Sequence, residues 1–377
     1  MKIAIYHRDI SGGIKTHVES LSREFEKQGH EVKRIDQFSL GSYMLGNTKG
    51  GISYGLDFAL SKIKEKVADC DILHIHHAAT VSELFLPFSS ICSDISIVNT
   101  FHTQTGEGLK GEVARTYISL IVTLYTGRSK KFISVSAENA EYLRQHCYVD
   151  NIYDYETGAG NSNSKSIKTG TELVVIPNGV DVNRFYPADK DTDTDMDKNG
   201  EERDDRKKPV CIGYLGRLSP EKNVIGMIKA VKALKQAEIN LKIAGTGPLF
   251  AKLKKLEDER IKILGYVEDA ASFYRSVDVF LLPSKLEAQP ITLLEAMASG
   301  LPIIATDVGD NKHFISGNGI LCGTSVKEIG AAIETMLSEK NGWVKMGIES
   351  RKIVEQNYTW DKIARRTLEV YRTALSS

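Results

Sequence analysis

Two cations in the C-terminal half of the chain follow a strand-like segment at a spacing that suits phosphate oxygens. Arg217 and Lys222 come directly after the apolar run 210–215, where Ser219 and Pro220 are typical of a helix start. Open α/β sheets bind ligands beyond the carboxyl ends of their strands, and a guanidinium together with an ammonium can hold a diphosphate there. The other interpretation is a surface arginine beside a lysine on a helix face.

Two carboxylates flank a second expected helix start, which again follows a strand-like run. The pattern places Pro290 at the first position of this helix and Gly300 just beyond its end. The free N–H groups of its first turn would form an anion site; they belong to Ile291, Thr292, Leu293 and Leu294. Glu295 could accept hydrogen bonds from a ribose, and Glu287 lies where a sugar attached to the diphosphate would sit. The alternative is an ordinary helix with a solvated glutamate.

Two glycine-containing turns also follow expected strands. Gly12 and Gly13 precede a helix, and Gly245 and Gly247 follow the apolar run 241–244. Such turns let the backbone approach a ligand, although they can equally be bare packing turns. The full G-x-G-x-x-G spacing is absent, which disfavours a nicotinamide dehydrogenase.

Several histidines lie at expected strand ends. His102 follows one strand, where a single histidine is usually structural, and His74, His76 and His77 lie at a neighbouring strand end. The period of two sends His74 and His76 to the same face of a buried sheet. Because carboxylate partners at metal spacing are absent nearby, we expect no metal there.

An acidic run at 191–197 contains Asp-x-Asp and part of a calcium-loop pattern. Arg206 occupies the position where a calcium loop needs a bidentate glutamate. The run also lies in a polar stretch away from any strand end, so we interpret it as a solvated loop.

The elements that would position these residues alternate between strand and helix in both halves. Many of the apolar runs are unbroken, which is typical of parallel strands buried on both faces. The expected strands are 3–6, 32–35, 72–75, 95–99, 132–135 and 173–176 in the first half, and 210–215, 241–244, 261–264, 279–282, 303–305 and 320–322 in the second. The pattern predicts an α/β protein of two Rossmann-like, doubly wound parallel-sheet domains.

Polar stretches divide the chain. We expect an N-terminal, acceptor-binding domain at 1–187, a mobile polar linker at 188–208 and a C-terminal domain at 209–358. The final helical segment, 359–377, can cross back to the first domain. The stretch 158–170 is expected to be a surface loop.

The composition excludes several classes of protein. Lys+Arg and Asp+Glu both total 49 in 377 residues, giving a formal net charge of +0, so a nucleic-acid partner is not expected. The hydrophobic content of 41% suits two cores rather than a multi-span membrane protein. Five widely spaced cysteines and a first strand that begins at once favour a cytoplasmic protein with reduced thiols and no signal peptide.

Five motifs together resemble the retaining glycosyltransferase family 4. They are Ser11-Gly12-Gly13, Phe101-His102-Thr103, Val175-Ile-Pro-Asn-Gly-Val-Asp181, Gly216-Arg217 with Glu221-Lys222, and Glu287-x7-Glu295 followed by Ala-Met-Ala-Ser-Gly300-Leu-Pro302. The resemblance covers essentially the whole chain, with the motifs in the family's order. It implies the GT-B architecture, in which the two domains face a cleft.

The resemblance also implies roles for individual residues. Gly13 would approach the donor phosphates, Arg217 and Lys222 would bind the diphosphate, and Glu295 would hold the ribose. Glu287 and His102 would lie beside the donor sugar. The backbone at Gly265, Tyr266 and Val267 would meet the base. Transfer would retain the anomeric configuration without a metal or cofactor, with a nucleotide-diphosphate sugar as co-substrate.

The sequence does not identify the donor sugar or the acceptor. The family usually has glycines after the first glutamate, whereas this chain has Ala288-Gln289-Pro290, and Pro290 has no N–H to donate. The acceptor could be a glycan, a lipid-linked molecule or a small molecule. The basic and apolar segment 110–131 either packs in the first domain or rests on the inner face of a membrane. A catalytically silent GT-B binding protein and a nucleotide-sugar epimerase are the alternatives to a transferase.

Overall fold

The computed structural model describes residues 1–7, 12–36, 60–77, 86, 95–102, 109–126, 129, 131–146, 151–154, 160–161, 172–188, 209–234 and 238–376. The acidic run at 191–197 lies outside these residues. So do the segment 39–51 and most of the segment 103–111, two N-terminal loops that we expect from the sequence to contact the acceptor. The chain divides into two compact units. The first unit comprises Met1–Gly179 and Trp360–Ser377, and the second comprises Val180–Thr359.

The division falls after Gly179, whereas the sequence pattern places it at residue 187. Val180 already belongs to the second unit because its N–H donates to the carbonyl of Tyr358 at 2.8 Å. Phe185 is buried in the same unit's core. The last helix, α14 (Trp360–Leu375), belongs to the first unit, where Tyr371 is buried.

The described part of the first unit contains an eight-stranded sheet in the order β2-β1-β3-β4-β5-β8-β6-β7. The strands are β1 (Lys2–His7), β2 (Glu31–Asp36), β3 (Ile72–His77), β4 (Ser96–Phe101), β5 (Lys131–Ser134), β6 (Asn151–Asp154), β7 (Gly160–Asn161) and β8 (Glu172–Val175). The pairing is parallel except between β6 and β7, which is antiparallel. The sequence pattern missed both of these strands and placed a loop across β7, because a two-residue strand carries no periodic signal.

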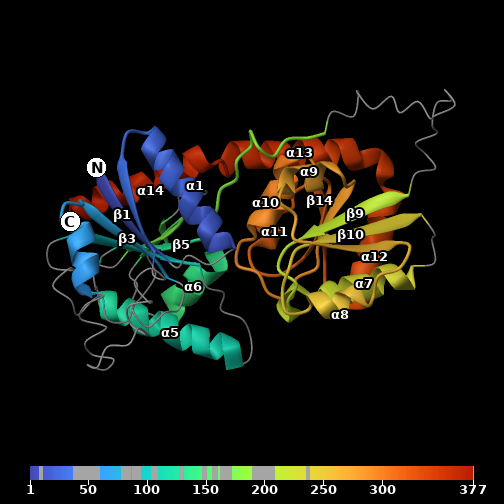
Figure 1. Cartoon of the computed structure of the whole chain (residues 1–377), viewed down its shortest axis with the longest axis horizontal. Helices are drawn as coiled ribbons and strands as arrows, with labels where there is room; N and C mark the ends of the chain where they lie inside the picture. The colour runs from blue at the N-terminus through green and yellow to red at the C-terminus, as the bar shows by residue number, and fades with distance from the viewer. Residues whose placement is uncertain are drawn as a thin grey trace. The chain divides into compact units, whose positions relative to one another are not determined.

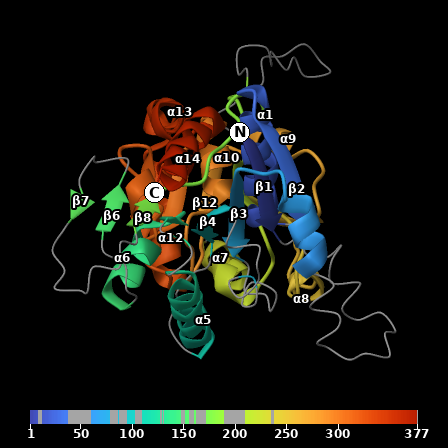
Figure 2. The ribbon, with the colours of Figure 1, turned by 90° about the vertical axis from the view of Figure 1, so that its left-hand side faces the viewer.

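Alternate residues of the central strands of this sheet face two different cores. Ile3 and Ile5 of β1 pack with α1 (Gly13–Lys27) and α14, while Ala4 and Tyr6 pack in the core that includes α5 (Leu109–Thr126) and α6 (Ala137–His146). Figure 2 shows the two pairs of helices on opposite sides of the sheet. Strands covered on both faces explain the unbroken apolar runs of the sequence.

The described part of the second unit contains a six-stranded parallel sheet in the order β11-β10-β9-β12-β13-β14. The strands are β9 (Val210–Leu215), β10 (Ile239–Ala244), β11 (Ile261–Gly265), β12 (Val279–Leu282), β13 (Ile303–Thr306) and β14 (Gly319–Cys322). This is the Rossmann order, in which the direction of winding reverses between the first and fourth strands. The reversal point here lies between β9 and β12.

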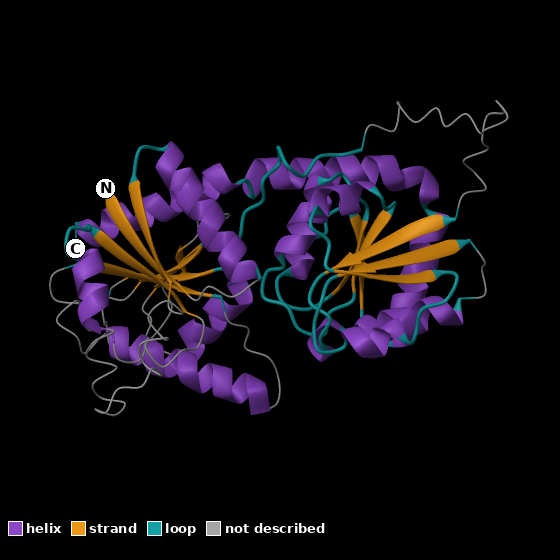
Figure 3. Cartoon of the chain, in the orientation of Figure 1, coloured by secondary structure: helices purple, strands orange, loops and turns teal. Residues whose placement is uncertain are grey.

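Helices cover both faces of the second sheet (Figures 1 and 3). They are α7 (Val224–Ala233), α8 (Phe250–Lys254), α9 (Ala270–Arg275), α10 (Ile291–Ala298), α11 (Asn311–Phe314), α12 (Val326–Ser338) and α13 (Trp343–Asn357), with short 3₁₀ turns at Pro220–Lys222 and Lys340–Gly342. The prediction of two doubly wound α/β domains is therefore confirmed.

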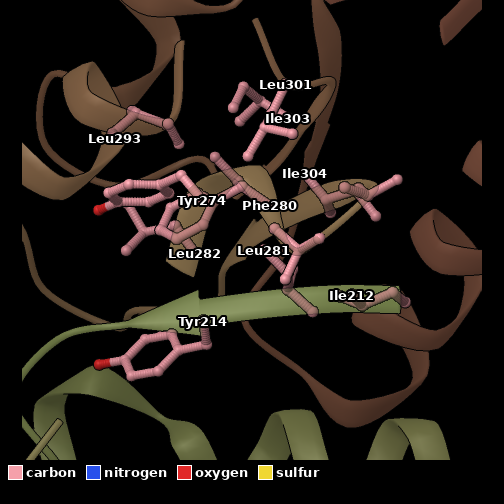
Figure 4. Packing of buried hydrophobic residues seen from close by; sticks show 14 of the residues in the cluster. Ile212, Tyr214, Tyr274, Phe280, Leu281, Leu282, Leu293, Leu301, Ile303 and Ile304 are labelled. Carbon is pink, nitrogen blue, oxygen red and sulfur yellow. The ribbon is translucent and has the colours of Figure 1, made fainter. Parts of the chain in front are cut away.

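Large buried side chains pack α9 and α10 against β12 (Figure 4). The ring of Tyr274 in α9 meets the ring of Phe280 in β12 edge-on, with centroids 5.6 Å apart. Leu293 of α10 is fully buried in the same core. Burying each such side chain contributes roughly 1.5–3 kcal/mol, so the core rigidly fixes where both helices begin.

Candidate functional site

The residues at the reversal point of the second sheet form a polar site. Since β9 pairs directly with β12, the loops that follow these strands leave the sheet side by side. The first loop carries Arg217 and Lys222, and the second carries Glu287. The geometry brings Lys222 and Glu287 together, with Arg217 on the same loop as Lys222, at the edge where doubly wound sheets bind ligands.

An ion pair joins the two loops. Nζ of Lys222 donates to Oε1 of Glu287 at 2.7 Å, and the hydroxyl of Ser284 donates to the same oxygen at 2.6 Å. Glu287 is only 7% exposed, while the Lys222 side chain is 23% exposed. The carboxylate is thus held in one orientation, and the ammonium keeps one side open to a further anion.

Two further hydrogen bonds anchor the loop that carries Glu287. The hydroxyl of Thr306, at the end of β13, donates to the carbonyl of Ser284 at 2.5 Å. The N–H of Lys285 donates to the carbonyl of Glu221 at 2.8 Å. Because the loop is tied to both neighbouring strands, Glu287 is preorganised before any ligand arrives.

Gly309 packs directly under this loop in a conformation that favours glycine. Its φ is +57°, and a Cβ atom there would lie 2.1 Å from the carbonyl oxygen of Glu287. The adjacent N–H of Asp310 donates to the carbonyl of Ala288 at 3.1 Å. Gly309 was not predicted from the sequence as part of the site, although a glycine just after the expected strand 303–305 indicates a turn there.

The sequence pattern predicts Pro290 as the first residue of α10, but in the structure the helix begins at Ile291. Pro290 is the N-cap, with φ −76° and ψ 117°, rather than the first helical residue. The N–H of Leu293 donates to the carbonyl of Pro290 at 3.1 Å, which takes this residue out of the predicted anion site. The N–H groups of Ile291 and Thr292 lie before Leu293 in the first turn and remain suited to bind an anion. The side chains of Leu293 and Leu294 are buried in the hydrophobic core.

Glu295 lies just beyond this first turn and is half-buried. The hydroxyl of Tyr274 donates to Oε2 at 2.9 Å. Burial raises the pKa of Glu295 to about 7, while the Tyr274 hydrogen bond and the charge of Arg184 act in the opposite direction. Glu295 is therefore an acceptor whose ionisation changes near neutral pH.

The glycines after β10 are required by backbone packing. Gly245 has φ +131°, and a Cβ atom there would lie 1.9 Å from the carbonyl oxygen of Gly216. The N–H of Leu218 donates to the carbonyl of Thr246 at 2.8 Å, so the turn at Gly245 supports the backbone on either side of Arg217. The guanidinium of Arg217 has no ion pair among the residues that the structure describes, and the residue is exposed.

Tyr266 and Val267 follow β11 at the same edge of the sheet. Tyr266 is 77% exposed, which is unusual for a tyrosine, whereas Val267 packs partly against the core. An exposed aromatic ring beside a turn offers a flat surface for stacking.

In the first unit, His102 follows β4 and contacts other histidines. Nε2 of His102 lies 2.8 Å from Nδ1 of His76, and the ring of His17 meets that of His102 edge-on at 4.8 Å. Burial holds the pKa of His102 well below its usual range, so the imidazole is neutral. Gly12 caps α1 with φ +138°, and Gly13 is its first, exposed residue.

The sequence analysis missed His17, which α1 brings to this group. Nδ1 of His17 donates to Oδ1 of Asn178 at 2.8 Å. The rings of His74 and His76 are tilted to each other, with centroids 4.1 Å apart, on the same face of β3, as the period of two predicts, and His77 packs on the opposite face against Phe101. The sequence holds one indication of this position: Asn178, the hydrogen-bond partner of His17, lies inside the motif 175–181.

The chain matches two family models that together cover most of its length. Residues 11–153 match the family described as Glycosyltransferase Family 4, and residues 209–339 match Glycosyl transferases group 1. The fold and these matches define a glycosyltransferase of the GT-B class.

Full-length relatives agree with this class. The chain is 25% identical to an uncharacterized glycosyltransferase of Methanocaldococcus jannaschii, over 100% of this chain and 99% of the relative. It is 26% identical to the phosphatidyl-myo-inositol mannosyltransferase of Mycolicibacterium smegmatis, over 98% of this chain and 92% of that protein. The chain belongs to glycosyltransferase family 4, and the predicted enzyme class, a hexosyltransferase-type glycosyltransferase, is confirmed.

Solved structures show the same fold at low identity. Sucrose-phosphate synthase of Thermosynechococcus elongatus aligns with a TM-score of 0.71 at 16% identity, covering 100% of this chain and 99% of that one. HepE of Anabaena, solved in complex with UDP-glucose, aligns with a TM-score of 0.73 at 17% identity, covering 99% of this chain and 100% of that one. The GT-B fold predicted from the sequence is therefore confirmed.

Helix α5 corresponds to most of the segment 110–131 that was considered for membrane contact. Ile118, Ile121, Val122 and Tyr125 are buried in the core of the first unit. This favours the packed interpretation for the C-terminal half of the helix. Among the described residues, none of the helices combines the length and apolarity that crossing a bilayer requires.

Proposed function

We propose that the protein transfers a hexose from a nucleotide-diphosphate donor to a hydroxyl group, with retention of the anomeric configuration. The observation that carries the proposal is the Lys222–Glu287 pair, fixed between two loops at the reversal point of the second sheet and close in sequence to the start of α10. This arrangement offers cationic and N–H groups to the diphosphate of a nucleotide sugar and carboxylates to its hydroxyl groups.

Each part of the donor has a partner in the proposal. The diphosphate is held by Arg217, Lys222 and the N–H groups of Ile291 and Thr292. Their combined positive charge supports a reaction without a metal or cofactor, because it stabilises the departing diphosphate. Glu295 accepts hydrogen bonds from the ribose hydroxyls, and the exposed ring of Tyr266 lies against the base.

In this proposal Glu287 contacts the donor sugar, and the roles of Gly12, Gly13 and His102 follow the family resemblance. Gly12 and Gly13 allow the backbone to approach the phosphates, and neutral His102 hydrogen-bonds a sugar hydroxyl. The bond from the anomeric carbon to the diphosphate oxygen breaks, and the acceptor oxygen bonds to the same face. The acceptor proton passes to the departing phosphate oxygen, so the step needs no separate general base.

A lipid-linked acceptor is favoured over a free sugar. One relative is named for transfer to phosphatidyl-myo-inositol, and another, from Escherichia coli, for transfer to diphosphoundecaprenol-linked GlcNAc, at 26% identity over 65% of this chain and 60% of that one. Such an acceptor would bring the enzyme to the inner face of a membrane as a peripheral protein. HepE binds UDP-glucose, which makes a uridine nucleotide the first donor to test.

The test is a melting-shift screen of the purified protein against UDP- and GDP-hexoses, followed by an assay for slow donor hydrolysis. Stabilisation by at least one nucleotide sugar is expected, whereas no binding to any of them would contradict the proposal. Product analysis separates the alternatives. An epimerase converts the donor without an acceptor, and a silent binding protein leaves the donor unchanged even when a lipid-linked acceptor is present.

Pro290 no longer favours the silent alternative. As the N-cap it removes one of four N–H groups at the helix start, and those of Ile291 and Thr292 follow it. The start of α10 therefore retains N–H donors for a phosphate despite the missing glycines in the loop before it.

A further inference from the structure

Three histidines from separate elements of the first unit converge at one place. His17 comes from the second turn of α1, His76 from β3, and His102 from the residue after β4. A ligand nitrogen of each lies within 4.8 Å of those of the other two. In the sequence they are 59 and 26 residues apart, which explains why no motif joins them.

The surroundings of His17 suit a metal ligand. Nδ1 of His17 donates to Oδ1 of buried Asn178 at 2.8 Å, which leaves the lone pair of the neutral ring on Nε2. Histidines that bind metals usually donate their other N–H to an oxygen in this way, because that bond fixes the tautomer and the ring orientation.

The second independent observation is an unsatisfied nitrogen on His76. This residue is fully buried, and its Nε2 has no hydrogen-bond partner among the described residues, while its Nδ1 lies 2.8 Å from His102. A buried polar atom without a partner costs free energy, and coordination of a cation through Nε2 of His76 would offset that cost. The neighbouring His74 is different, since its two nitrogens pair with Tyr371 and Thr100 at 2.5 and 2.6 Å.

The sequence alone predicts no metal at the strand-end histidines, but α1 brings His17 to them. We propose that His17, His76 and His102 form a binding site for a divalent transition cation of the zinc type. Zinc–nitrogen bonds of about 2.0–2.1 Å place tetrahedral ligands roughly 3.3 Å apart, so each ring has to move by about 1 Å or less. His102 is partly exposed, so the fourth position would be open to a water, which as hydroxide would supply the negative charge that the three neutral rings lack.

The cation would act as an inhibitor of transfer, a consequence that rests on the proposed function. His102 cannot use one nitrogen for both the cation and a hydroxyl of the donor sugar. Metal binding therefore withdraws the coordinated nitrogen from the sugar and holds the ring in the metal-bound orientation, and transfer itself needs no metal. Binding and inhibition are separate measurements, so the failure of one is distinguishable from the failure of the other.

The experiment titrates the metal-free protein with Co²⁺, whose visible absorption reports four-coordinate geometry, and then displaces Co²⁺ with Zn²⁺. The wild type is expected to give a one-to-one tetrahedral spectrum. His76→Gln and His17→Gln should each weaken Zn²⁺ binding by at least tenfold. The matched controls are His77→Gln, a buried histidine on the other face of β3, and His313→Gln, an exposed one; both should bind as the wild type does.

The absence of a tetrahedral Co²⁺ spectrum in the wild type would overturn the site, whether or not the variants fold. Unchanged Zn²⁺ affinity in folded His76→Gln would also overturn it. In the transfer assay, Zn²⁺ should lower the rate, and a chelator should restore it. If no transfer occurs with or without chelator while the Co²⁺ spectrum persists, the proposed function fails and the metal site stands.

Discussion

The ammonium of Lys222 and the carboxylate of Glu287 meet at 2.7 Å across two loops that are 65 residues apart in the sequence. Each loop follows a strand, and those two strands are neighbours in the sheet. The pairing matters because it fixes a largely buried carboxylate next to a cation that is still accessible. It also couples stability to the site, which makes the arrangement testable by mutation.

Removing one member of this pair should destabilise the protein more than removing both. Lys222→Met leaves the buried Glu287 carboxylate with Ser284 alone, at a cost of about 1–3 kcal/mol in the free energy of unfolding. In Lys222→Met/Glu287→Gln the buried charge is gone, so part of the loss should be recovered. Urea unfolding of the wild type, both single variants and the double variant measures the coupling. Strictly additive losses would contradict the structural pair.

Glu287→Gln should reduce turnover more than donor affinity. The side chain keeps its size, and the Ser284 hydroxyl can still donate to it, but the fixed negative charge beside the sugar is lost. We expect kcat to fall by roughly 10²–10³, with KM for the donor changed much less. Steady-state kinetics with the donor found in the screen measures both. A loss confined to KM would place Glu287 outside the reacting part of the site.

Donor binding should depend on pH through Glu295. Its pKa is raised to about 7, so the protein increasingly loses a carboxylate acceptor for the ribose as the pH falls from 8 to 6. We expect weaker donor binding at pH 6 than at pH 8. Glu295→Gln should bind weakly at both values. Calorimetric titrations at the two pH values measure this, and a wild-type affinity independent of pH would contradict the assignment.

Glu295 should also make the free energy of unfolding depend on pH, and in the opposite direction to donor binding. Because the pKa of Glu295 is higher in the folded protein than its ordinary value of 4.5, the folded state binds more protons between about pH 4.5 and 7. Its contribution to stability is therefore present at low pH and is lost as the pH rises through this window. Glu295→Gln should flatten that part of the pH profile of unfolding relative to the wild type.

Gly309→Ala should impair the site through the loop that carries Glu287. A Cβ atom at this position meets the Glu287 carbonyl oxygen at 2.1 Å, so the loop has to shift. Gly317→Ala is the matched control, since Gly317 also has a positive φ, +76°, but its Cβ would meet nothing within 4 Å. Both variants should lose about 1–3 kcal/mol to backbone strain. Only Gly309→Ala should also lower kcat, and equal kcat values would show that the loop tolerates the shift.

The sequence predicts the fold well because its strands are covered on both faces. All six strands expected in the second half are present, and β9 and β12 match the predicted bounds. β6 and the two-residue β7 escape prediction because their pairing is decided by tertiary contacts rather than by periodicity. The N-cap position of Pro290 differs by one residue for a similar reason, since a proline fits the cap and the first turn alike.

The site is predicted less completely than the fold. Lys222 and Glu287 were identifiable from their places after strands, but their ion pair depends on the strand order β9-β12, which sequence alone does not give. Gly309 and His17 were missed because their importance comes from what lies against them in space. For His17 that partner is Asn178, which is 161 residues away.

Calorimetric titration of the wild type and Lys222→Met at pH 8 with the stabilising nucleotide sugar tests the central claim most directly. The account predicts one-to-one binding to the wild type and at least tenfold weaker binding to the variant, because the diphosphate loses a cation. Equal affinity in a folded Lys222→Met variant, or no binding of any nucleotide sugar to the wild type, would contradict it.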